Sequence, residues 1–110
     1  MTLKEIKQMI ASIGLPYAYD HFKNPRKPPY VCFTYPESDN FGADNKVYIK
    51  SMDLNIELYT DEKEPELEET VEGVLYAYDL FYDFSETYIE SEKMYMVTWT
   101  TTIVVSKEEQ

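Results

Sequence analysis

The chain has 110 residues, of which 44% are apolar and 15% aromatic, and its formal net charge is −11. This length fits one domain, and the lack of an apolar run of about 18 residues excludes a spanning helix. The surplus of carboxylates disfavours a nucleic-acid groove, which needs clustered Lys and Arg to neutralise phosphates. A cleaved leader is not expected, because the opening MTLKEIKQMI mixes charges into its apolar pattern.

The charge is distributed unevenly along the chain. Residues 1–50 carry a net charge of +2, whereas residues 51–110 carry a net charge of −13. The two halves of the sequence therefore differ sharply in their electrostatics.

The first predicted element is a helix over residues 3–13. Thr2 and Glu5 form a capping-box pattern, in which side chains satisfy free N–H groups at the start of the helix. Gly14 is a ready C-terminal stop, and Pro16 prevents continuation. Apolar residues recur at helical spacing at Leu3, Ile6, Ile10 and Ile13.

Two short strands with a proline-rich connection are predicted next. Residues 17–22 and 30–35 are rich in aromatic and other β-forming residues, and KNPRKPP lies between them. Each proline lacks an N–H, which bars a central strand there, so this connection is expected to be exposed. Cys32, the only cysteine, cannot form an internal disulfide and is expected to be a buried thiol.

A loop and a long strand follow. Residues 36–45, PESDNFGADN, are predicted to be a loop because Gly, Asn, Asp and Ser favour turns. Residues 46–60 are predicted to be extended, with apolar positions at Met52, Leu54, Ile56 and Leu58 alternating with polar ones. Such alternation indicates an antiparallel sheet with one covered face.

The second predicted helix begins near Pro65. Its apolar stripe consists of Leu67, Val71, Val74, Leu75 and Tyr78. A different side is acidic, with Glu64, Glu66, Glu68, Glu69 and Glu72. This side is interpreted either as a solvated helix face or as an electrostatic surface that meets a basic partner or repels a polyanion.

Two further strands, residues 81–89 and 93–105, are joined by a tight polar turn at residues 90–92. The predicted order is α-β-β-β-α-β-β. It indicates an α+β fold with a single antiparallel or mixed sheet of about four to five strands and two helices on one face. Residues 1–105 are predicted to form this single domain, and residues 106–110 a polar tail.

The segment LYAYDLFYDF, residues 75–84, holds more aromatic side chains than one helix end can easily bury. Some belong to the core or to strands, but tyrosine is also enriched at interfaces, where its ring is buried and its hydroxyl stays bonded. Tyr76 and Tyr82 are therefore candidate interface residues.

No catalytic, metal or cofactor site is predicted. His21 is the only histidine, and its neighbour Asp20 would point to the opposite face of a strand. No serine lies in a nucleophile elbow, and Cys32 is without a second histidine to pair with. The ESDNFGADN segment has oxygen ligands, but Tyr48 stands where an EF-hand needs its closing glutamate. Paired Cys/His spacings for zinc and glycine-rich phosphate loops are missing.

The sequence resembles the small tail-completion proteins of long-tailed bacteriophages and prophages, namely tail terminators and related head–tail joining proteins of the minor capsid type. The stretches that carry the resemblance are LKEIKQMIASIGLPYAYDHF, PPYVCFTYPESDNFGADNKVY, LNIELYTDEKEPELEETVEGVL and TYIESEKMY. The sequence departs from the family at LYAYDLFYDF, where a more polar turn containing Gly is expected.

The resemblance implies a virion protein that forms a ring, often a hexamer, which caps the tail tube and docks to the head connector. It implies assembly in the host cytoplasm, DNA passage through the ring without specific binding, and no membrane. It also implies no enzymatic activity and no cofactor.

Head-to-tail contacts in a ring join different patches of neighbouring subunits. Lys23, Arg26 and Lys27 are therefore candidates to meet the acids around Glu64–Glu72 of the next copy. A complementary hypothesis places some of these acids in the lumen, where they keep passing DNA from sticking. The rival interpretation is a soluble acidic inhibitor or DNA mimic that uses the same carboxylates to occupy a basic groove. An enzyme is a third and weaker interpretation.

Overall fold

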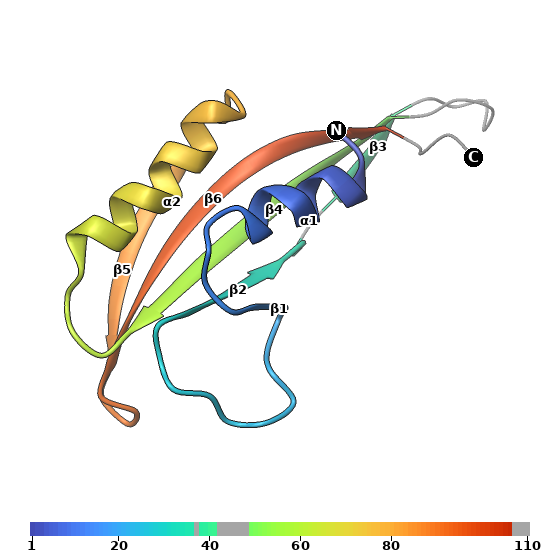
Figure 1. The fold of residues 1–110 in the computed structure, drawn as a ribbon. Coiled ribbons are helices and arrows are strands. Elements are labelled where there is room, and N and C mark those ends of the chain that lie inside the picture. Colours follow the sequence, from blue (N-terminus) through green and yellow to red (C-terminus); the bar gives the residue numbers. More distant parts are fainter. Residues whose placement is uncertain (37, 42–48, 107–110) are drawn as a thin grey trace.

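The computed structural model of the chain describes residues 1–36, 38–41 and 49–106. It contains two helices and one sheet, and both helices lie on the same side of that sheet (Figure 1). The elements in chain order are α1 (Leu3–Ala11), β1 (Tyr17–Tyr19), β2 (Tyr30–Thr34), β3 (Ser38–Phe41), β4 (Ile49–Thr60), α2 (Pro65–Ala77), β5 (Asp83–Ile89) and β6 (Met94–Ser106). The predicted α+β class is confirmed.

The sheet follows the order β1-β2-β4-β6-β5, with β3 paired to β4 beside this path. β1 runs parallel to β2, and all the other pairs are antiparallel, so the sheet is mixed. The predicted element order is recovered, with β3 added. The sheet is built around β4 and β6, which stay paired from Ile49 opposite Ser106 to Thr60 opposite Tyr95.

The loop prediction is wrong for Ser38–Phe41. These residues pair with Ile49–Met52 of β4. β2 pairs only with residues 55–59 of β4, so β3 covers what would be an open edge. Pairing thus overrides the weak β propensity of Ser, Asp and Asn. Residues 37, 42–48 and 107–110 lie outside the described residues, and with them the rest of this loop, most of the calcium-loop candidate and most of the predicted tail.

The start of α1 confirms the predicted capping box. The Glu5 N–H donates to Thr2 Oγ1 at 3.1 Å, and the Thr2 N–H donates to Glu5 Oε1 at 2.8 Å. The helix ends at Ala11, before the predicted end, and Gly14 follows with φ of +91°. Its buried side, made of Ile6, Met9 and Ile10, faces the sheet.

The core lies between the helices and one face of the sheet. The alternation predicted for β4 is observed: Leu54, Ile56 and Leu58 are buried on the covered face. Trp99 of β6 lies opposite Ile56 and is fully buried. Its indole Nε1–H donates to Glu72 Oε2 of α2 at 3.0 Å, which ties this helix to the centre of the sheet.

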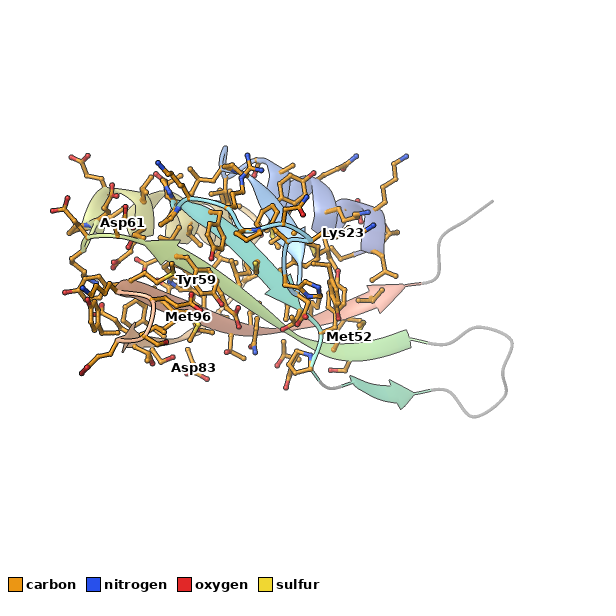
Figure 2. All side chains as sticks on the ribbon, turned by 90° about the horizontal axis from the view of Figure 1, so that it is seen from below. Lys23, Met52, Tyr59, Asp61, Asp83 and Met96 are labelled. Atoms are coloured by element: carbon orange, nitrogen blue, oxygen red, sulfur yellow. The ribbon has the colours of Figure 1, made fainter. Side chains whose placement is uncertain are left out.

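The other face of the sheet has no helix over it among the described residues. Tyr59 and Met96, which are paired across β4 and β6, lie on this face in Figure 2. Polar side chains bridge the same two strands: Thr100 Oγ1 donates to Asn55 Oδ1 at 2.8 Å, and Thr102 Oγ1 donates to Asp53 Oδ1 at 3.1 Å. These two hydrogen bonds pair polar side chains with one another on the uncovered face.

Candidate interaction surfaces

Cys32 is a buried thiol and not an exposed nucleophile. Cys32 is only 3% exposed, and burial, followed by the nearby Glu57 and Asp20 carboxylates, raises its thiol pKa to about 11. This confirms the predicted buried thiol. Within residues 1–36, 38–41 and 49–106, no group of three or more His, Cys, Asp or Glu side chains is placed to hold a metal ion. None of the described helices is both long and apolar enough to cross a bilayer.

The expectation that Asp20 and His21 point to opposite faces is wrong. β1 ends at Tyr19, three residues before its predicted end, and Asp20 adopts a left-handed φ of 65°. Alternation holds only inside a strand, and in this turn His21 Nδ1 lies 2.8 Å from Asp20 Oδ2. Both side chains are well exposed, at 74% and 60%.

The basic residues form an exposed loop between β1 and β2, as predicted. This basic loop comprises Lys23, Arg26 and Lys27. The Arg26 guanidinium lies 5.3 Å from the ring centroid of Phe22, and Phe22 contacts Tyr30 edge-on. Such cation–π contacts hold a cationic loop without neutralising it. The loop therefore presents its charge at the β1 edge of the sheet.

The five predicted glutamates of α2 divide into two groups. Glu68 accepts from Lys63 Nζ at 2.7 Å, Lys63 also pairs with Glu86 of β5, and Glu72 accepts from Trp99. The hydrogen bonds to Glu68 and Glu86 raise the pKa of Lys63. The remaining three are exposed and form the acidic surface: Glu64, Glu66 and Glu69.

The chain turns at the end of α2 without the glycine that was expected there. Asp79 follows the C-cap with φ of 59°, its N–H donates to the Tyr76 carbonyl, and the Leu80 N–H donates to the Leu75 carbonyl, both at 3.0 Å. This is a Schellman motif, in which Asp replaces Gly at the left-handed position. Leu80 then packs against the core, and Phe81 is left 94% exposed.

An aromatic surface results where α2 ends and β5 begins. It consists of Tyr76, Phe81, Tyr82 and Phe84, which are 83%, 94%, 38% and 48% exposed. Burial, and then the neighbouring Glu72 carboxylate, raises the pKa of Tyr82. A hollow of about 590 Å³ is lined by Glu72, Tyr76, Asp79, Leu80, Phe81 and Tyr82. The structure therefore brings the two predicted tyrosines together and confirms that this segment has more aromatics than the fold buries.

Phe81 and Phe84 were not singled out in the sequence as candidate interface residues. Both lie inside the aromatic run 75–84, so composition marks the segment. The Schellman turn exposes Phe81, and the pairing of β5 places Phe84 opposite Trp99.

The basic loop lies beside β1, whereas the acidic and aromatic surfaces belong to α2, the turn after it and the start of β5. The strand order places β1 at one edge and β5 at the other. Lys23 and Asp83 mark these two sides in Figure 2. The predicted basic and acidic candidates are thus not brought together within one molecule, and a contact between them requires a second molecule.

No protein-family model matches this chain, and no curated protein matches it in sequence. Its fold is similar to that of a chain in a solved structure described as the virion of a native gene transfer agent (GTA) particle. The two chains are 16% identical, with a TM-score of 0.56, and the match covers 96% of this chain and 89% of the other. At this identity the likeness shows a shared fold.

Proposed function

We propose that this protein is a structural subunit of a phage-like virion, located in the tail or neck. The observation that carries the proposal is the fold likeness to a chain of the GTA virion, which extends over nearly the full length of both chains. The stretches that resemble tail-completion proteins support the narrower role of a tail terminator or head–tail joining subunit. In that role the protein forms a ring at the end of the tail tube, with tail-tube and head-connector proteins as its partners.

The charge of the two sheet edges supports a ring built from head-to-tail contacts. In such a contact, the basic loop of one copy meets the acidic surface of the next copy. Opposite charges at the rim of a contact set its register and increase the association rate more than they increase affinity. Exposed carboxylates that face the lumen repel passing DNA.

The proposal is tested on the full chain at high concentration in low salt. Native mass spectrometry and negative-stain microscopy are expected to show a closed ring of identical subunits. Because assembly can require the tail, the labelled protein is also mixed with purified tails, where we expect it at one end. A protein that stays monomeric, is absent from tail ends and binds a basic nuclease or repressor tightly would instead be an acidic inhibitor.

A further inference from the structure

The strand β6 extends beyond its neighbour β5. β5 pairs with residues 94–100 of β6, whereas β4 pairs with residues 95–106. Past Thr100, no strand of the described residues pairs with β6 on the side that β5 leaves open. A strand edge of this kind presents unpaired N–H and C=O groups to a further strand.

One backbone hydrogen bond shows which N–H and C=O groups of this stretch point to its open side. The N-terminal ammonium of Met1 donates to the Val104 carbonyl at 3.1 Å, close to where α1 starts beside β6 in Figure 1. In an antiparallel ladder, the N–H and C=O of one residue point to the same side, and they alternate along the strand. The N–H and C=O of Thr102 therefore share the open side with the Val104 carbonyl.

A hollow of about 490 Å³ lies at this edge, and we call it the edge groove. It is lined by Asp53, Asp79, Leu80, Phe81, Tyr82, Asp83, Thr100, Thr101 and Thr102. Three of these residues are carboxylates, and none is Lys, Arg or His. Thr101 is only 3% exposed, and its Oγ1 has no hydrogen-bond partner among the described residues.

We propose that the edge groove binds an extended, basic segment of another protein, which adds to β6 as a short strand. The backbone of the segment pairs with Thr102, as in other cases of strand addition. Its alternate side chains fall on the two faces of the sheet. On the uncovered face, Asp53 is paired with Thr102 and Asp83 with Thr100. Lysine side chains of the bound segment are therefore favoured on that face. Leu80 and Phe81 offer apolar contacts for the residues between them.

A second copy of this chain is a poor occupant of the edge groove. Among the described residues, the exposed basic loop is KNPRKPP, and its three prolines lack the N–H that a strand partner must donate. The groove also lies at the opposite end of α2 from the acidic surface. The inference therefore goes beyond the proposed ring and does not depend on it.

The experiment uses the capped peptide acetyl-Lys-Val-Lys-Val-Lys-amide and the ¹⁵N-labelled full chain. We expect saturable shifts of the Thr102 and Val104 amide resonances, slower exchange of the Thr102 N–H, and weaker binding as salt rises. Asp53→Asn and Asp83→Asn are each expected to weaken binding about threefold, and together about tenfold, as exposed ion pairs do. Glu90→Gln, an exposed carboxylate in the turn between β5 and β6, is the matched control and leaves binding unchanged.

Two peptide controls separate strand addition from charge attraction. A version N-methylated at alternate residues keeps its charge but loses its backbone donors, and a version with Glu for Lys keeps its donors but reverses the charge. Both are expected to lose binding. Equal binding by either control, or an unchanged affinity in the double variant, overturns the proposal. A second copy of the chain in the groove would also overturn the proposal. In that case the native chain would not bind the peptide, and the Asp53 and Asp83 variants would lose self-association.

Discussion

The two helices cover the same face of the sheet, but their ends are built differently. α1 begins with a complete capping box, and its apolar side is buried beneath it. α2 ends in a left-handed Asp79, after which the chain exposes Phe81 and its neighbours. Folding alone accounts for the residues around α1. It does not account for the aromatic surface at the end of α2, and this difference points to recognition there.

The largest expected difference in stability is between variants of two adjacent residues of α2. Leu75 is fully buried, whereas Tyr76 beside it is 83% exposed. Leu75→Ala is expected to lower the free energy of unfolding by about 2–5 kcal/mol, because it leaves a cavity in the core. Tyr76→Ala is expected to change it by less than about 0.5 kcal/mol. Urea titrations of both variants check this, and similar losses would mean that the aromatic surface serves the fold.

The attachment of α2 to the sheet gives the next largest effect. Trp99→Phe removes the indole N–H that donates to Glu72 and leaves that partly buried carboxylate short of a partner. The expected loss is about 1–3 kcal/mol. A double-mutant cycle with Glu72→Gln measures the coupling between the two side chains. Strictly additive losses would show that the hydrogen bond does not hold the helix.

The start of α1 gives a smaller effect. Thr2→Ala removes the side chain that accepts from the Glu5 N–H. The expected cost is about 1 kcal/mol, the usual value for a lost N-cap. Thr2→Ser keeps the acceptor and serves as the control, and the two variants are compared by thermal unfolding. Equal melting temperatures would show that the capping box does not stabilise α1.

The effect that is smallest near neutral pH concerns the ionisation of Cys32. The pKa of Cys32 is raised from 9.0 to about 11 in the fold, so the folded state holds this proton more tightly than the unfolded chain does. The associated stability is complete below pH 9 and is lost as the pH rises towards 11. At pH 8 a thiol reagent is expected to label Cys32 slowly in the native protein and rapidly in urea. Equal rates would contradict its burial.

Local patterns in the sequence predicted the parts of the fold that local rules control. The cap at Thr2, the alternation along β4 and the polar turn before β6 are each written into a few consecutive residues. β3 could not be predicted in this way, because its pairing partner is β4 and its own composition favours a loop. The Asp20–His21 contact and the left-handed Asp79 depend on backbone angles that residue type alone does not fix.

The candidate site was predicted as a set of charges and aromatics, but not as surfaces. Sequence could not show that Glu68 and Glu72 are held within the fold by Lys63 and Trp99. The Glu72–Trp99 contact joins residues 27 positions apart in the chain. Together the two contacts narrow the acidic surface to three glutamates. The edge groove depends on the different lengths of β5 and β6, which no single segment reveals.

The central claim is that opposite edges of the sheet meet between copies, and a charge swap tests it most directly. One variant places Glu at Lys23, Arg26 and Lys27, a second places Lys at Glu64, Glu66 and Glu69, and a third carries both sets. Sedimentation velocity in low salt is expected to show assemblies for the native chain, a loss of assembly in each single set, and recovery in the combined variant. The claim would be contradicted if either single set of substitutions left assembly unchanged, or if the combined variant did not recover assembly.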